Sequence, residues 1–112
     1  MERRAQFAST GGPEVIVWVD VDLPPPGTGE VQMRNTAIGL NYIDTYHRSG
    51  LYPMALPSAL GMEAAGVIEA VGAECRLRQG DRVLVLRSEV GITRQGTLAE
   101  YVVAPEESVA PV

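Results

Sequence analysis

Residues 61–72 read GMEAAGVIEAVG, and this stretch indicates a β fold. The run from Met62 to Val71 is typical of a β-strand, and a glycine stands on either side of it. Its Ala-Ala-Gly centre carries little side-chain bulk, which indicates that another backbone approaches closely there or that the strand bends. We therefore expect Gly61 and Gly66 to be required by the fit of the backbone.

Strand patterns continue on both sides of this stretch. Gly and Pro divide the chain into short segments, and most of these alternate or carry β-branched residues. Residues 23–29 (LPPPGTG) are expected to form a stiff exposed connector. Six or seven short strands at this spacing predict one mainly β domain over residues 1–112, built as a compact barrel or sandwich. The other expected strands are the segment after Arg4, Val15–Val21, Glu30–Ile38, Asp81–Leu86 and Leu98–Val103, the last of which Pro105 closes.

Only two places in the chain look helical, and residues 40–48 are the better one. Asn41 is a possible N-cap, and Asp44 would lie in the first turn, where its charge suits the helix dipole. Gly50 is placed to end the helix. The expected fold class is therefore mainly β with one or two short helices.

Composition limits the classes of function. The chain has 112 residues, of which 46% are hydrophobic, and a formal charge of −5. This acidic balance argues against nucleic acid or an anionic membrane surface as a partner. The longest apolar runs are about five residues, far below the ~20 needed to span a bilayer, and no secretory signal is expected. The single cysteine, Cys75, fits a reducing cytoplasm and is interpreted as a structural thiol near a turn.

Three common kinds of site are not supported by the spacing of the residues. A dinucleotide-binding βαβ unit would need a third glycine at position 32, which is Gln32, and a helix after it. The glycines at 61 and 66 have phosphate-loop spacing, but Val67 stands where a lysine is required. Zinc needs four ligands from Cys, His and carboxylate, and Cys75 and His47 form no paired spacing. No metal site is expected.

The polar and aromatic chemistry of the chain gathers in residues 39–53, GLNYIDTYHRSGLYP. On a helix, Tyr42 and Tyr46 share a face, with Asn41 beside them. A phenol offers a flat apolar wall to a planar ligand and an O–H group to a carbonyl. The residues alone leave two interpretations open: one wall of an active site, or a loop whose rings pack as a local cluster. His47 by itself is more often exposed or hydrogen-bonded than catalytic.

Six segments of the chain carry one resemblance: GGPEV (11–15), LPPPGTGEV (23–31), GLNYIDTYHRSGLYP (39–53), GMEAAGVIEAVG (61–72), GDRV (80–83) and LAEYVV (98–103). Together they resemble the N-terminal, GroES-like domain of the medium-chain dehydrogenases/reductases, in the zinc-independent NADPH:quinone oxidoreductase branch related to zeta-crystallin. The resemblance runs nearly from end to end and implies a GroES-like, partly open β-barrel. It also implies hydride delivery from NADPH to a quinone or another α,β-unsaturated carbonyl.

The resemblance also implies roles for individual residues. Tyr46 and Tyr52 are expected to be catalytic, by orienting and polarising the substrate carbonyl. Asn41 and Asp44 are expected to bind the cofactor by positioning the nicotinamide or the ribose. Glu63 is expected to be a buried carboxylate paired with an arginine near the cleft, rather than a group that takes part directly in the chemistry.

The positions that hold zinc in other members of this superfamily carry different residues here. The zinc enzymes have a cysteine in the segment that matches residues 40–41, where this chain has Leu-Asn. They have Gly-His-Glu where residues 61–63 read Gly-Met-Glu, and a four-cysteine lobe downstream that this chain lacks. The resemblance therefore implies that the protein uses no zinc.

These 112 residues contain no counterpart of the family's Rossmann domain or of the C-terminal segment that completes its catalytic domain. We expect a fragment of a longer reductase, half of a split enzyme with a separate Rossmann-domain partner, or a stand-alone binding or assembly module that keeps the GroES-like fold. The isolated chain is expected to be inactive, because binding of the adenosine and pyrophosphate positions the nicotinamide. An apolar face bared by the missing domain is expected to favour a symmetric homodimer.

Overall fold

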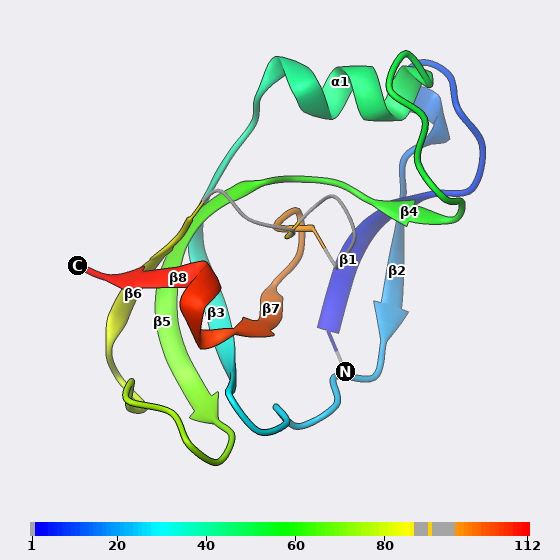
Figure 1. Ribbon diagram of the computed structural model, residues 1–112. Coiled ribbons are helices and arrows are strands. Elements are labelled where there is room, and N and C mark those ends of the chain that lie inside the picture. Colours follow the sequence, from blue (N-terminus) through cyan, green and yellow to red (C-terminus); the bar gives the residue numbers. More distant parts are fainter. Residues whose placement is uncertain (1, 87–89, 91–95) are drawn as a thin grey trace.

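The computed structural model describes residues 2–86, 90 and 96–112, and strands dominate them (Figure 1). The only α-helix in these ranges is α1 (Tyr42–Ser49), which confirms the mainly β prediction. None of the described helices is long and apolar enough to cross a membrane. The other elements are β1 (Glu2–Phe7), the 3-10 turn η1 (Pro13–Val15), β2 (Val17–Val21), β3 (Glu30–Gly39), β4 (Ser58–Ala59), β5 (Glu63–Val71), β6 (Arg82–Val85), β7 (Tyr101–Pro105), the 3-10 turn η2 (Glu106–Ser108) and β8 (Val109–Pro111).

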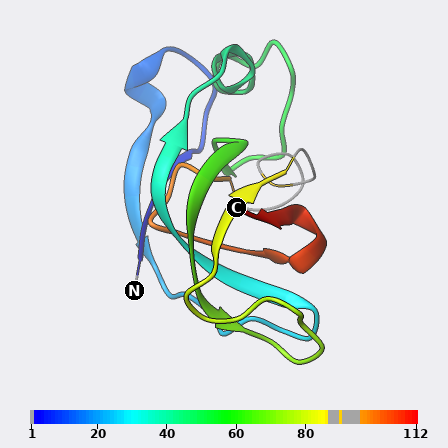
Figure 2. The same cartoon turned by 90° about the vertical axis from the view of Figure 1, so that its left-hand side faces the viewer.

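The strands form two antiparallel sheets. One sheet has three strands in the order β2-β1-β4, and the other has five in the order β7-β3-β5-β6-β8. A bridge between Arg4 and Ala99 joins β1 to the segment that leads into β7. The two sheets therefore curl around a common interior and leave one side open, while α1 stands above them (Figures 1 and 2). The partly open barrel that the resemblance implied is confirmed.

The apolar core lies on the inner face of the five-stranded sheet. The core forms because side chains alternate along each strand, which places every second residue on the same face. Fully burying a side chain the size of valine, isoleucine or methionine stabilises the fold by about 1.5–3 kcal/mol. The core cluster consists of Val31, Met33, Ala64, Ile68, Val83 and Val109.

A buried charge ties β1 to β7. Glu2 is fully buried, and its Oε1 accepts hydrogen bonds from Arg4 Nε (3.0 Å) and Nη2 (2.8 Å). Its Oε2 accepts the backbone N–H of Tyr101 at 3.0 Å. Such a carboxylate is tolerated because both of its oxygens have donors.

The Cys75 thiol donates a hydrogen bond to the Glu30 carbonyl oxygen at 3.3 Å, as expected of a structural thiol.

Close backbone approach explains the glycines of the stretch at 61–66. Gly66 pairs with Asn35 of β3, and a Cβ on Gly66 would lie 2.2 Å from the Arg34 carbonyl oxygen. Gly61 has a φ of +102°, and a Cβ there would lie 2.5 Å from Thr97 Oγ1. Both glycines are therefore required by the fit of the backbone, which confirms the prediction.

Several expected strand boundaries were wrong. The strand expected from Val15 begins at Val17, because Pro13–Val15 form a 3-10 turn after two glycines. The strand expected from Leu98 to Val103 is β7, which begins at Tyr101 and includes Pro105 as its last residue. The segment before β7 bonds elsewhere: the Leu98 carbonyl accepts the Ala5 N–H, and the Glu100 N–H bonds the Arg3 carbonyl.

Short strands were missed in the sequence. β4 and β8 have only two and three residues and are defined by their partners, β1 and β6. β1 begins at Glu2, earlier than the strand-like segment expected after Arg4. The described residues therefore contain eight strands, against the six or seven expected.

Candidate functional site

Helix α1 is held at its first turn by the residues predicted to cap it. Asn41 is the N-cap with extended backbone (φ −128°, ψ 160°), and its N–H donates to Asp44 Oδ2 at 3.0 Å. This is the carboxylate half of a capping box. At the other end Gly50 adopts the left-handed conformation (φ 88°), which glycine reaches without strain. The helix predicted for residues 40–48 is thus confirmed, together with its caps.

The far end of α1 is joined to the loop between β1 and β2. The Arg48 carbonyl accepts the Gly11 N–H at 3.0 Å, and Arg48 Nε donates to the Gly11 carbonyl at 3.1 Å. The residues of α1 that are buried, Asp44 and His47, are polar. Helix α1 is therefore fixed in place mainly by hydrogen bonds at its two ends.

The side chain of Asn41 reaches across to β5. Its Nδ2 donates to Glu63 Oε2 at 3.0 Å, and both residues are exposed. The Glu63 N–H in turn donates to Oγ1 of the buried Thr97 at 3.2 Å, which holds the start of β5 in place. The expectation of a buried Glu63 paired with an arginine was wrong, because its partner among the described residues is the Asn41 amide.

Asp44 and His47 lie on the underside of α1, one turn apart. Asp44 is 6% exposed and His47 is 4% exposed. Asp44 Oδ1 and His47 Nδ1 are both buried, and neither atom has a hydrogen-bond partner among the described residues. His47 is therefore buried rather than exposed, and the interpretation that it is not catalytic stays a prediction. Asp44 reaches the site through the Asn41 backbone, so its predicted contact with a cofactor stays a prediction.

The tyrosines predicted to be catalytic form a pair. The rings of Tyr46 and Tyr52 lie 5.4 Å apart between centroids in an edge-to-face arrangement, at 69° between planes. The Tyr52 N–H donates to the Tyr46 carbonyl at 3.2 Å, which draws the loop after α1 back onto the helix. Tyr42 is 82% exposed and belongs to no ring pair of the described residues. No hydrogen bond within these ranges joins the tyrosine pair to Asn41 and Glu63.

A pocket of about 340 Å³ opens beside the Asn41–Glu63 bond. Among the described residues that line it, all but Glu63 are apolar and none is an arginine or a lysine. No signal in the sequence indicated the aliphatic wall, because its residues have the pattern of ordinary strand residues. The lining residues are Ala37, Ile38, Gly39, Glu63, Ala64, Ala65, Leu84 and Val85.

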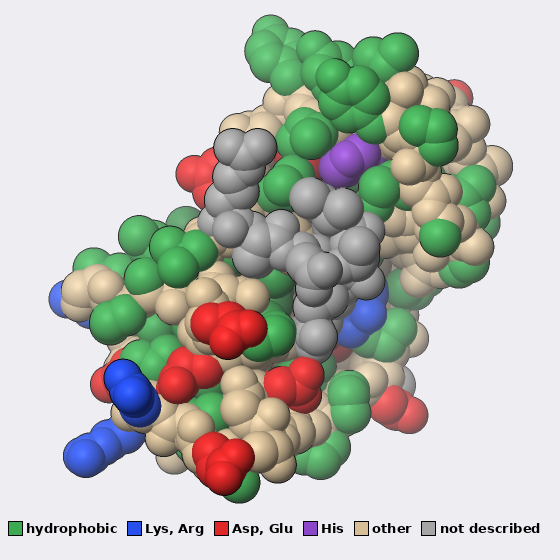
Figure 3. Space-filling view, in the orientation of Figure 1, with side chains coloured by type: hydrophobic (Ala, Val, Ile, Leu, Met, Phe, Trp, Pro, Cys, Tyr) green, Lys and Arg blue, Asp and Glu red, His purple; other side chains and the backbone are tan. Residues whose placement is uncertain are grey.

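Exposed apolar side chains lie over α1 and the loop that follows it. Figure 3 shows hydrophobic side chains gathered at this end of the molecule, whereas acidic side chains gather at the opposite end of the same face. Scattered apolar residues are ordinary on a surface, but a contiguous group suggests a contact with another surface. Those that the structure exposes here are Leu40, Tyr42, Leu51, Tyr52 and Leu56.

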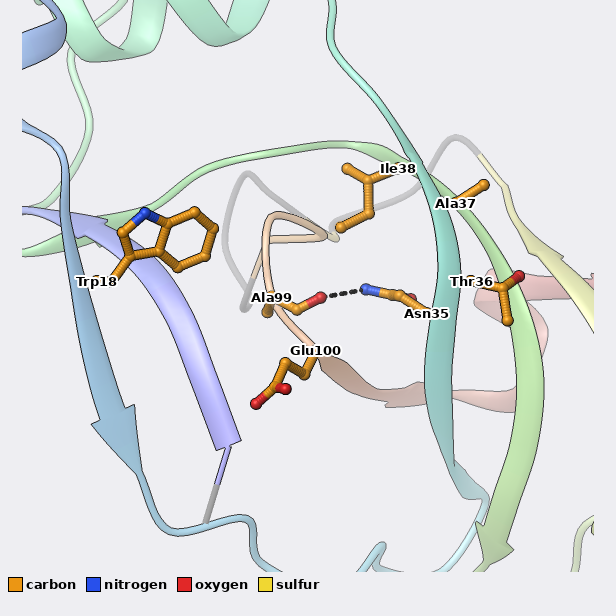
Figure 4. Close-up of a pocket in the computed structure, with 7 residues that line it drawn as sticks. All are labelled: Trp18, Asn35, Thr36, Ala37, Ile38, Ala99 and Glu100. Atoms are coloured by element: carbon orange, nitrogen blue, oxygen red, sulfur yellow. Dashed lines mark hydrogen bonds between the residues drawn. The ribbon is translucent and has the colours of Figure 1, made fainter.

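A second pocket, of about 320 Å³, lies between β2 and β3 and contains none of the predicted site residues. Figure 4 shows the Trp18 ring on one side of this pocket and Ile38 on the other, with Ala99 and Glu100 between them. Asn35 links β3 to the segment before β7 in this pocket, because its Nδ2 donates hydrogen bonds to the carbonyl oxygens of Thr97 (3.0 Å) and Ala99 (2.8 Å).

Within the described residues, no group of three or more His, Cys, Asp or Glu side chains gathers where it could hold a metal ion. Asn41 and Met62 stand at the two positions where the sequence comparison expected zinc ligands in the zinc enzymes. Their amide and thioether are not the thiolate, imidazole or carboxylate that zinc takes from proteins.

Tyr101 lies on β7, apart from this site. Burial, and then the negative charge of Glu69, raise the pKa of Tyr101 above its ordinary value. Its Oη donates to Glu69 Oε2 at 3.4 Å. The protonated phenol therefore favours the native state below the unfolded pKa, and this contribution is lost as pH rises through the folded pKa.

In an ultraviolet titration of phenolate formation, Tyr101→Phe is expected to remove the transition that occurs at the highest pH, and Glu69→Gln is expected to move that transition to lower pH. An unchanged curve for both variants would contradict this.

The fold and the capped helix agree with a match to a known family. Residues 27–112 match the family model described as the alcohol dehydrogenase GroES-like domain. The chain therefore belongs to this family, and the GroES-like fold expected from the sequence is confirmed.

Within this family, the chain is similar in sequence to quinone oxidoreductases. A quinone oxidoreductase of Pseudomonas aeruginosa is 55% identical over 93 residues, covering 81% of this chain and 29% of the relative. Quinone oxidoreductase 1 of Escherichia coli is 47% identical over 93 residues, covering 81% of this chain and 28% of the relative. The resemblance to quinone oxidoreductases is confirmed, and the chain spans less than a third of the length of these two relatives.

Solved structures give the same result. A quinone oxidoreductase of Pseudomonas syringae has a TM-score of 0.88 and 48% identity, covering 100% of this chain and 34% of that one. The quinone oxidoreductase of Escherichia coli, solved in complex with NADPH, has a TM-score of 0.85 and 38% identity, covering 98% of this chain and 33% of that one.

Proposed function

We propose that residues 1–112 form one GroES-like domain that supplies one wall of the nicotinamide and substrate cleft of a zinc-independent, NADPH-dependent reductase of quinones or other α,β-unsaturated carbonyls. The observation that carries the proposal is the Asn41–Glu63 hydrogen bond beside an apolar pocket, on a fold shared with quinone oxidoreductases. The nucleotide-binding domain would lie outside these residues, either in the same polypeptide or in a separate partner.

The pocket beside Glu63 suits the nicotinamide end of the cofactor. Its aliphatic wall includes Ile38 and Leu84, which can contact a flat ring, and the Asn41 amide lies at its rim. Among the described residues that line the pocket there is no cation for a pyrophosphate. The residues present therefore fit the reacting end of NADPH and leave its adenosine and phosphates to another domain.

The residues of this chain would position and polarise rather than transfer electrons. When bound, NADPH supplies the hydride. Glu63 fixes the Asn41 amide, and Asp44 fixes the Asn41 backbone, so Asn41 is held in one orientation. A hydroxyl from Tyr46 or Tyr52 would donate a hydrogen bond to the substrate carbonyl oxygen, where negative charge grows as hydride arrives. The donor set at Asn41 and Met62 supports chemistry without zinc.

The isolated chain is expected to bind NADPH with a Kd weaker than ~1 mM, equivalent to less than about 4 kcal/mol of binding. The reason is that no arginine or lysine among the described residues lines the pocket to bind the phosphates. An NMR titration with NADPH should therefore give small shifts confined to Asn41, Glu63 and their neighbours, and NADPH with a benzoquinone should show no chain-dependent oxidation. Micromolar binding, or shifts centred on the Trp18 pocket, would contradict the proposal.

We also propose that the exposed apolar side chains over α1 meet the nucleotide-binding domain, and that the chain forms a homodimer. The nucleotide-binding domain and the second copy must bind different surfaces of the chain if both are to be bound at once. The face over α1 carries the predicted site residues Tyr46 and Tyr52, so a second copy that covered it would close the site.

A further inference from the structure

Strand β2 is an open edge of the three-stranded sheet. It pairs with β1 from Val17–Gln6 to Val21–Glu2, and no other described residue bonds to its second edge. In Figures 1 and 2 this strand runs along the outer boundary of the sheets, on the side away from β3. An edge of this kind presents a row of backbone N–H and C=O groups to any strand that can lie beside it.

The usual protection of an edge strand is absent from β2. Its sequence is VWVDV, with no proline, no lysine and a single charge at Asp20. Val17 is 51% exposed and Trp18 is 55% exposed. Proteins commonly guard such edges with lysine, proline or a covering loop. The described residues place none of these on β2, so the edge is suited to pairing.

The sequence of β2 is complementary to itself in one antiparallel register. The strand has five residues, so full overlap of two copies centres on Val19 and places Val19 opposite the partner's Val19. Trp18 then lies opposite the partner's Asp20. A shift of one pair toward the C-terminus would place two Asp20 carboxylates opposite each other, and like charges in that position are destabilising. A shift of one pair in either direction also shortens the overlap, because β2 runs only from Val17 to Val21.

Charge supports the same register. Arg3 is opposite Asp20 across β1 and β2, and its guanidinium carbon lies 5.8 Å from the centre of the Trp18 ring. Within the described ranges Arg3 forms no ion pair. Because side chains alternate along a strand, Arg3, Trp18 and Asp20 share one face. The partner's Asp20, opposite Trp18, would therefore bring a carboxylate to this cation.

We propose that two copies of this chain associate through β2 as a symmetric antiparallel pair centred on Val19, which joins their three-stranded sheets into one continuous sheet. The proposal gives an interface to the homodimer proposed above, and it does not depend on the reductase chemistry. One short pair of strands buries little surface, so the Kd is expected to be weaker than about 1 μM. The face over α1 stays free for the nucleotide-binding domain.

Cysteine cross-linking tests the register directly. In a Cys75→Ser background, Val19→Cys is expected to form a covalent dimer under mild oxidation, because cross-strand Cβ atoms lie about 4.5–5.5 Å apart at the two-fold axis. Val17→Cys is the matched control: it is the more exposed position, yet its two copies would lie about 13 Å apart along the strands. Cross-linking that is absent from Val19→Cys, or equally fast in both variants, would overturn the proposal.

Charge variants provide a second test without oxidation. In sedimentation equilibrium the natural chain is expected to dimerise reversibly, whereas Val19→Lys alone and Val19→Glu alone remain monomeric at the same concentration. Their equimolar mixture is expected to regain the dimer, because opposite charges then meet at the axis. Circular dichroism checks that both variants are folded. A natural chain that stays monomeric at ~1 mM, or a mixture that stays monomeric, would refute the interface and leave the proposed reductase role untouched.

Discussion

Replacing Gly66 by alanine is expected to destabilise the fold by about 3 kcal/mol, the upper end of the usual cost of overpacking. The added Cβ would lie 2.2 Å from the Arg34 carbonyl oxygen and 3.0 Å from Met33 Cγ. The carbonyl is backbone in the middle of the β3–β5 pairing, so it can move only if the strands separate. Thermal unfolding followed by circular dichroism should show a loss in Tm on the order of 15 °C.

Gly27→Ala is the matched control for this prediction. A Cβ on Gly27 would first meet Glu30 Oε1 at 3.2 Å, and that atom is the end of a flexible side chain in an exposed connector. The control is expected to change Tm by only a few degrees. Equal losses in the two variants would show that the close approach of β3 and β5 does not govern stability.

Of Tyr46→Phe and Tyr52→Phe, the variant that removes the donor is expected to lower kcat by about 10²-fold, the cost of removing one preorganised donor to a developing oxyanion. The test requires a chimera in which this chain replaces the matching segment of the Pseudomonas aeruginosa quinone oxidoreductase, which is 55% identical to it over 93 residues. The phenylalanines keep the edge-to-face pair, so the loop after α1 should keep its place. Stopped-flow measurement of NADPH oxidation separates kcat from KM.

Tyr42→Phe is the control for the tyrosine variants. Tyr42 lies on the same helix, but its side chain is 82% exposed and it belongs to no ring pair in the part of the chain described. Its replacement is expected to leave kcat within about twofold, because surface changes of this kind have small effects. If all three variants kept full activity, the assignment of the donor to Tyr46 or Tyr52 would be wrong, although the fold and the family would stand.

Local signals made much of the fold predictable. The cap at Asn41, the charge at Asp44 and the glycine at Gly50 lie within one helix and its ends, so the sequence alone defined that helix. The long strands β3 and β5 were predicted for the same reason, since alternation over nine or ten residues is a strong signal. Strands β4 and β8 were missed because pairing with distant strands, rather than their own composition, defines them.

The site was predictable only in part, because its contacts join distant segments. Nothing in residues 39–53 indicates that the Asn41 amide bonds Glu63, or that Ile38 and Leu84 share a pocket wall. The burial of His47 depends on what lies under α1, which helical periodicity does not specify. The resemblance identified the segment that carries the site, and the structure then gave its neighbours.

The attachment of α1 has a consequence for local unfolding. Because its buried residues are polar and its ends are tied by Arg48 to Gly11 and by Asn41 to Glu63, it draws little support from the apolar core. Segments with few buried apolar contacts open at lower free energy than the whole protein. In native-state hydrogen exchange, the amides of α1 should therefore exchange through a partial opening while β3 and β5 remain protected. Heating would accordingly dismantle the candidate site while the barrel is still intact.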